Sequence, residues 1–375
     1  MTDAPLRILF VSDAIRATRT GTGRIAETWL RELHALGAEV IPLDREPNPI
    51  AERIAGRCEV LPTRGALLRT ARWHFDLLRR VPTLGVEHDV LFDPSAYPNV
   101  RGEHPRQAVL VHDLSMLQPG LYRRGKRAWF RAFYGRALRR ARLKVCVSEH
   151  TRRALIERFA LPADECVVVP NAIDPAFPTA PARRPRELPD GPFLLAVGAI
   201  ERRKNVGRLL AAFMATDLPH RLVFVGRPGA DVGDLPARLR AASPRVVWLQ
   251  ATDDDELRWC YRNAGALLFP SLEEGFGLPI LEAMQSDLPV LTSNVTAMPE
   301  VAADAALLVD PRNVEALRDG IVRVATDEAL AAELRARGRR RSAQFAPRDH
   351  ARALLGHLTA LARTAAPVAT ERSRS

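Results

Sequence analysis

LLFPSLEEGFGLPILEAM, residues 267–284, is the stretch around which the rest of the chain is organised. It begins with an apolar run, Ala266 to Phe269, which is typical of a buried parallel strand. Gly275 and Gly277 then allow a tight turn with exposed backbone. Leu278 to Gln285 is predicted to be a helix, because a proline in its first turn loses no needed hydrogen bond. A strand, a bare turn and a helix N-terminus therefore meet at one place.

Two glutamates bracket this unit: Glu274 lies at the turn and Glu282 lies within the helix. Helix N–H groups bind anions, and carboxylates accept hydrogen bonds from hydroxyl groups. Either glutamate alone is more simply explained as a solvated turn or helix acid. Their spacing around Gly-Phe-Gly instead favours a site for an anionic ligand that carries hydroxyls.

The segment EGFGLPILEAM, 274–284, resembles the Glu-x7-Glu signature of the retaining nucleotide-sugar glycosyltransferases of family 4, which have the GT-B fold. A second segment, GAIERRKN at 198–205, resembles the element of that family in which Arg and Lys hold the donor diphosphate. Family members commonly have Pro where this chain has Arg202. The resemblance covers almost the full chain. It implies an α/β protein with two facing Rossmann-like domains, each built on a doubly wound parallel sheet, and an active site between them.

The resemblance also implies roles for single residues. Arg203 and Lys204 would stabilise the departing diphosphate, and fixed cations are suited to charge that develops on a leaving group. Glu274 would orient the sugar, and Glu282 would accept from the ribose hydroxyls. The other expected donor-binding residues are Gly21, Gly23, Gly198, Gly226, Gly275, Phe276, Gly277 and Leu278.

His112 follows a predicted strand, Gln107 to Val111, at the end where open α/β sheets bind their ligands. Position alone is equally compatible with a structural histidine at a sheet edge. The segment VHDL resembles the same family, in which this histidine lies near the transferred sugar. We therefore expect His112 to be catalytic, with its carbonyl or ring near the reacting carbon.

A segment near the N-terminus matches the residue pattern of the dinucleotide-binding fingerprint. Gly21, Gly23 and Ala26 fit G-x-G-x-x-A, and Asp44 follows about twenty residues later. However, Ser12 to Thr20 separate the first strand from the first glycine. An NAD-dependent dehydrogenase therefore stays only as an alternative function.

Strands and helices alternate along the chain, beginning with a predicted strand over Leu6 to Val11. The alternation restarts with a predicted strand over Phe193 to Val197, after a segment rich in Pro and Arg. Two domains are therefore expected. The predicted parts are an acceptor domain over 1–178, a linker over 179–191, a donor domain over 192–346, a helix crossing back over 347–363 and a disordered tail over 364–375.

Composition excludes several classes of protein. Apolar residues make up 47% of the chain and no apolar run reaches the roughly 18 residues that span a bilayer. No signal peptide is visible, so we expect a cytoplasmic protein. The cysteines and histidines lack metal-ligand spacing. Asp253-x-Asp255 is better explained by a capping box of Thr252 with Asp255 than by a metal site. No metal or cofactor is expected, since the nucleotide sugar is a co-substrate.

The segment 121–144 holds ten basic residues and no acidic one, interleaved with aromatic residues. One explanation is a helix with one core face and one solvated face. Another is a basic amphipathic helix on an anionic membrane surface, at the inner face of the membrane. No base-reading motif accompanies this charge, so nucleic acid is not an expected partner.

The resemblance implies transfer of a hexose, with retention, to a saccharide or lipid-linked saccharide acceptor. TGTGR at 20–24 and HDL at 112–114 look most like bacterial surface-polysaccharide mannosyltransferases that use GDP-mannose. Glucosyl or N-acetylglucosaminyl transfer from a UDP-sugar remains open. An inactive GT-B scaffold protein is the remaining alternative.

Overall fold

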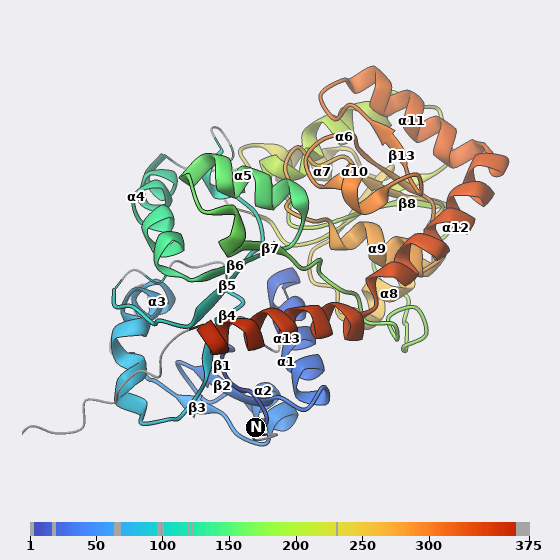
Figure 1. The fold of residues 1–375 in the computed structure, drawn as a ribbon. Coiled ribbons are helices and arrows are strands. Elements are labelled where there is room, and N and C mark those ends of the chain that lie inside the picture. Colours follow the sequence, from blue (N-terminus) through green and yellow to red (C-terminus); the bar gives the residue numbers. More distant parts are fainter. Residues whose placement is uncertain are drawn as a thin grey trace, which may run out of the picture.

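The computed structural model describes residues 4–16, 20–63, 69–95, 99, 101–118, 121, 124–229 and 232–364. In these residues the chain forms two lobes, each built on a parallel sheet (Figure 1). The N-terminal lobe is blue to green and the C-terminal lobe is mostly yellow to orange. The predicted fold class, two Rossmann-like domains of the GT-B type, is confirmed. The predicted disordered tail lies outside the described residues apart from Thr364.

The N-terminal sheet has the strand order β3-β2-β1-β4-β5-β6-β7, and all its described pairings are parallel. Its strands are β1 (Arg7–Val11), β2 (Glu39–Asp44), β3 (Glu59–Val60), β4 (Val90–Asp93), β5 (Gln107–Val111), β6 (Leu143–Cys146) and β7 (Cys166–Val168). The helices of this lobe are α1 (Gly21–Ala35), α2 (Pro49–Ala55), α3 (Arg69–Arg80), α4 (Arg124–Arg140) and α5 (Glu149–Phe159). The short β3 and α2 were not predicted, since two and seven residues are too few to show a period.

The C-terminal sheet has the order β10-β9-β8-β11-β12-β13. Its strands are β8 (Phe193–Val197), β9 (Arg221–Val225), β10 (Val246–Leu249), β11 (Leu267–Phe269), β12 (Val290–Ser293) and β13 (Leu307–Val309). The helices that follow β8 along the chain are α6 (Val206–Met214), α7 (Leu235–Ala241), α8 (Asp254–Asn263), α9 (Leu278–Gln285), α10 (Met298–Ala302), α11 (Val314–Thr326), α12 (Glu328–Ser342) and α13 (Pro347–Thr364). The strand order reverses between β8 and β11, which is where such sheets bind their ligands.

One buried apolar cluster runs through both lobes. Helix α13 joins the N-terminal lobe, where Leu354 and Leu358 belong to the same cluster as Trp29 of α1 (Figure 1). The connection between the sheets is also packed, because Phe177 and Leu188 are buried. The packing of these segments makes the two lobes one continuous body in this structure.

Side chains cap the starts of two helices near the site. Ser148 caps α5 by accepting from the Thr151 N–H. The predicted capping box at α8 was shifted by one residue, because Asp253 is the N-cap and its partner is Glu256. Asp253 therefore has a capping role here. In the part of the chain that the structure describes, no helix is long and apolar enough to span a membrane.

Candidate active site

The turn between β11 and α9 is pressed against the N-terminal lobe. A Cβ atom added at Gly275 would lie 1.7 Å from the His112 carbonyl oxygen, so only glycine fits. The Gly275 carbonyl accepts hydrogen bonds from Ser148 Oγ at 2.6 Å and from Thr151 Oγ1 at 3.2 Å. Gly277 precedes α9 with a φ of 109°, which favours glycine. The decisive sequence stretch is thus also a contact between the lobes.

Glu274 lies between two cations. Lys204 Nζ is 2.6 Å from Glu274 Oε1, and Arg203 Nη1 is 2.9 Å from Glu274 Oε2. Only 9% of the Glu274 side chain is exposed. Burial alone would raise the pKa of the Glu274 carboxyl, but Lys204 and Arg203 outweigh burial and hold this pKa below its ordinary value. Burial lowers the pKa of the Lys204 ammonium, although Glu274 opposes the shift. The structure therefore brings the predicted residues Arg203, Lys204 and Glu274 together.

Two predicted glycines make room for Lys204. Gly198 has a φ of 130°, and a Cβ there would lie 3.0 Å from Lys204 Cε. A Cβ at Gly226 would lie 2.1 Å from the Gly198 carbonyl oxygen. The ammonium of Lys204 also lies 4.5 Å from the ring centroid of Phe269. Both glycines are therefore explained by close packing around the lysine.

Glu282 is held by partners from both lobes. Tyr261 donates its hydroxyl hydrogen bond to Glu282 Oε2 at 2.7 Å, within the C-terminal lobe. Arg24 of α1 donates from Nη1 to Glu282 Oε1 at 3.1 Å and also pairs with Asp254. Burial alone would lower the pKa of Arg24, but Glu282 and Asp254 raise it. Arg24 therefore joins the two lobes through the carboxylate that was predicted to bind ribose.

His112 lies at the C-terminal end of β5. Its Nε2 is 2.8 Å from the Pro94 carbonyl oxygen, and because a carbonyl only accepts, Nε2 carries the proton. Burial lowers the pKa of His112, so the ring is neutral at pH 7. The carbonyl oxygen of His112 faces the Gly275 turn. A neutral ring and a carbonyl dipole are thus placed beside the Glu274 loop.

The other predicted site residues differ in what surrounds them. Gly23 lies against the Ala14 carbonyl, since a Cβ there would be 2.6 Å from that oxygen. Gly21 has open space around its missing Cβ. The Phe276 ring is buried and packs edge-on against Phe345, so the ring is not available to a ligand. Leu278 lines a cavity of about 210 Å³ that Arg24 and Glu282 also border.

The dinucleotide alternative does not fit this geometry. Gly21 and Gly23 lie in the first turn of α1, capped by Thr20, and not in a turn directly after β1. Asp44, the expected ribose acid, is fully buried and accepts from Arg16 and Asn48 at 2.8 Å. Because no part of Asp44 is exposed, its carboxylate is out of reach of a ligand.

Sequence reasoning assigned no role in the site to Tyr261, Asp254 or the Glu300 carboxylate. Glu300 accepts from the Glu149 N–H at 2.7 Å and from the His150 N–H at 3.0 Å, so α10 caps α5 across the lobes. These contacts join residues about 150 positions apart. A periodic pattern cannot reveal such pairs. Among the described residues, no group of three or more His, Cys, Asp or Glu side chains is arranged to hold a metal ion.

Comparison with known proteins places the chain in a family. Residues 19–177 match the model described as Glycosyltransferase Family 4, and residues 181–341 match the model for glycosyl transferases group 1. O-antigen chain mannosyltransferase B of Escherichia coli is 28% identical over 91% of this chain and 96% of that protein. The serotype-specific mannosyltransferase WbdA of Escherichia coli is 30% identical over 58% of this chain but only 29% of its own length.

Solved structures agree on the fold. Sucrose-phosphate synthase from Thermosynechococcus elongatus superposes with a TM-score of 0.74 at 19% identity, covering 96% of this chain and all of that one. HepE of Anabaena, solved with UDP and glucose, has a TM-score of 0.73 at 16% identity, covering 95% of this chain and all of HepE. The two family models, the relatives and the shared architecture together show that this chain belongs to the GT-B glycosyltransferases of the family 4 type.

Proposed function

We propose that the protein transfers a hexose from a nucleotide sugar to a saccharide or lipid-linked saccharide in cell-surface polysaccharide assembly. The observation that carries this proposal is the cluster of Arg203, Lys204 and Glu274 at the reversal point of the C-terminal sheet. The names of the O-antigen relatives support the surface polysaccharide. NAD-dependent oxidation has no comparable support.

The proposed chemistry follows from charge. Arg203 and Lys204 face a donor diphosphate and stabilise the negative charge that grows on it as the glycosidic bond breaks. Their ion pairs with Glu274 hold both cations in place before the donor arrives. Glu274 then accepts from a hydroxyl of the sugar, and Glu282 accepts from the ribose. Because two cations already serve the diphosphate, we propose that no metal takes part.

We propose GDP-mannose as the donor and retention as the stereochemical outcome. Two relatives named as mannosyltransferases support mannose. The signature 274–284, which resembles retaining enzymes, supports retention, and the His112 carbonyl would stabilise positive charge at the reacting carbon. A UDP-sugar is the second candidate, because the similarly folded HepE was solved with UDP and glucose.

The test is an assay of nucleotide release and product formation. The purified protein is mixed with GDP-mannose, UDP-glucose or UDP-N-acetylglucosamine and with saccharide acceptors of bacterial surface polysaccharides. Turnover with GDP-mannose and an α-anomeric proton in the NMR spectrum of the product would support the proposal. Absence of turnover with every donor, from a folded protein, would favour the inactive scaffold.

We also propose a cytoplasmic protein that contacts the inner face of the membrane through α4. The apolar side of α4 is already used inside the protein, since Phe130, Tyr134 and Leu138 are buried in a core cluster. Membrane contact would therefore rest on the basic side alone and should weaken with salt. Co-sedimentation with anionic vesicles at low salt tests this; absence of binding would contradict membrane contact.

A further inference from the structure

A second cavity, of about 210 Å³, lies mainly in the N-terminal lobe and is bordered by the Gly275 turn. We propose that this cavity, which we call the arginine pocket, binds a phosphate or diphosphate group of the acceptor. The proposal deepens the proposed function and rests on it. The arginine pocket is lined by Leu114, Leu117, Gln118, Arg127, Arg131, His150, Thr151, Ala154, Arg158, Glu273 and Gly275.

Position ties the arginine pocket to the candidate active site. Helices α4 and α5 form one wall and pack together, since the Tyr134 and Phe159 ring centroids are 6.2 Å apart. Leu114 follows His112 by two residues, and Gly275 follows Glu274 directly. A group bound here would therefore lie next to the loops that carry His112 and Glu274.

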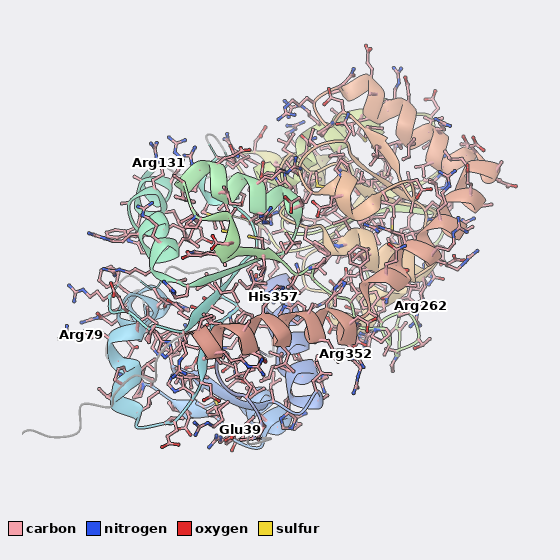
Figure 2. The ribbon with its side chains drawn as sticks, in the orientation of Figure 1. Glu39, Arg79, Arg131, Arg262, Arg352 and His357 are labelled. Atoms are coloured by element: carbon pink, nitrogen blue, oxygen red, sulfur yellow. The ribbon has the colours of Figure 1, made fainter. Side chains whose placement is uncertain are left out.

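Charge gives the chemical class of the ligand. Arg127 and Arg131 come from α4 and Arg158 comes from α5, and none of the three forms an ion pair with another described residue. Figure 2 labels Arg131 on α4, in the N-terminal lobe. The acid on the wall, Glu273, lies 3.8 Å from His150 Nε2. Three like charges around one cavity favour an anion, and the planar guanidinium fork matches phosphate oxygens.

The helix end cannot supply this site by itself. The N–H groups of Glu149 and His150 at the start of α5 already donate to Glu300, and that of Thr151 donates to Ser148. The anion must therefore be held by the arginine side chains. The cavity is also smaller than the roughly 300 Å³ of a typical small-molecule site. It suits one or two phosphate groups and not an entire oligosaccharide.

The experiment measures binding of inorganic pyrophosphate by calorimetry. All proteins carry Lys204→Ala, which removes one of the two proposed donor cations and so weakens the donor site as a competing anion site. In this background we compare Arg131→Gln/Arg158→Gln with Arg136→Gln/Arg153→Gln. The second pair is a matched control, since both of its arginines are exposed on the same two helices and do not line the cavity.

We expect the arginine-pocket pair to weaken pyrophosphate binding by about 100-fold, since losing one charged hydrogen bond costs about tenfold. The control pair should change it by less than about twofold. Equal affinity in both pairs, or no binding in the Lys204→Ala background, would overturn the proposal. A phosphate group could belong to the acceptor or to a lipid headgroup. Vesicles containing phosphatidylglycerol distinguish these two sources. If the arginine-pocket pair loses vesicle binding but keeps pyrophosphate binding, the arginines contact membrane and the proposal is wrong.

Failure of the proposed function has a different signature. In that case the protein with Lys204 intact releases no nucleotide from any sugar nucleotide, whatever the arginine pocket binds. With turnover present, the acceptor role predicts that Arg131→Gln/Arg158→Gln raises the KM for a phosphate-bearing acceptor and leaves the donor KM unchanged. An unchanged acceptor KM would exclude the acceptor role.

Discussion

The two glutamates of the 274–284 stretch are both buried, but they are held in different ways. Glu274 is neutralised inside the C-terminal lobe by Arg203 and Lys204. Glu282 shares its carboxylate between Tyr261 of its own lobe and Arg24 of the other. The surroundings of Glu274 therefore persist if the lobes separate, whereas those of Glu282 depend on closure. We infer that the first site is preorganised for chemistry and that the second couples donor binding to the position of the lobes.

We expect the largest loss of activity when one of the two cations beside Glu274 is removed. Lys204→Ala removes one of two cations from a buried site, and loss of one such group costs about 10²-fold to 10³-fold in kcat. Steady-state nucleotide release measures this effect. Arg240→Ala is the control, because Arg240 lies exposed on α7. Turnover of Lys204→Ala within a few-fold of the unsubstituted protein would contradict the diphosphate assignment.

Glu282→Gln tests the other side. It keeps the shape but removes the charge that Arg24 and the ribose hydroxyls would use, so nucleotide affinity should fall about tenfold, the cost of one charged hydrogen bond. Calorimetry with a nucleoside diphosphate and with its 2′,3′-dideoxy analogue measures the effect. The unsubstituted protein should bind the dideoxy analogue more weakly than the nucleoside diphosphate. Glu282→Gln should bind the two ligands with nearly equal affinity. Additive losses would show that Glu282 does not contact the ribose.

The lowered pKa values of Lys204 and Glu274 predict how activity and stability depend on pH. Because the pKa of Lys204 lies below 10.5, its positive charge, and with it kcat/KM, should be lost as pH rises at a midpoint below 10.5. Lys204→Arg should remove that alkaline limb. The pKa of Glu274 lies below 4.5, so its contribution to stability is present above pH 4.5 and is lost as pH falls through the lower value. An alkaline limb unchanged in Lys204→Arg would assign the titration to another group.

Arg24→Ala tests whether Glu282 is coupled to closure. Without Arg24, the contacts between lobes that remain at Ser148, Thr151 and Glu300 should allow partial opening. Small-angle X-ray scattering should then show a larger radius of gyration for Arg24→Ala than for the unsubstituted protein. Lys204→Ala should leave the radius of gyration unchanged. Equal profiles for both variants would remove the difference between the two glutamates.

The smallest expected effect is at the cap between the lobes. Glu300→Gln replaces a charged acceptor at the start of α5 with a neutral one, which should cost about 1 kcal/mol of stability. Thermal unfolding measures it, and Glu315→Gln, at an exposed position in the first turn of α11, serves for comparison. A larger loss in Glu315→Gln would show that the inter-lobe cap has no special weight.

Local pattern predicted much of the fold. The strand Phe193–Val197 and the helix Leu278–Gln285 have the predicted bounds, because their apolar runs end at a glycine or begin at a proline turn. The same reasoning placed the α8 cap one residue too early, since Thr252 and Asp253 are both good caps. The motif residues Arg203, Lys204 and Glu274 were predicted together, but their ion pairs were not. The link between Arg24 and Glu282 spans 258 positions and follows only from the packing of the two lobes.

Thermal unfolding against a panel of nucleotides tests whether Arg203 and Lys204 hold a donor diphosphate. The panel holds GDP, UDP, ADP, their common sugar conjugates and NAD, each tested on the unsubstituted protein and on Lys204→Ala. A ligand at about 100 times its Kd stabilises by about 2.7 kcal/mol, which raises Tm by several degrees. We predict a rise with GDP and GDP-mannose that Lys204→Ala greatly reduces. A rise with NAD alone, or equal rises in both proteins, would contradict a donor diphosphate held by Arg203 and Lys204.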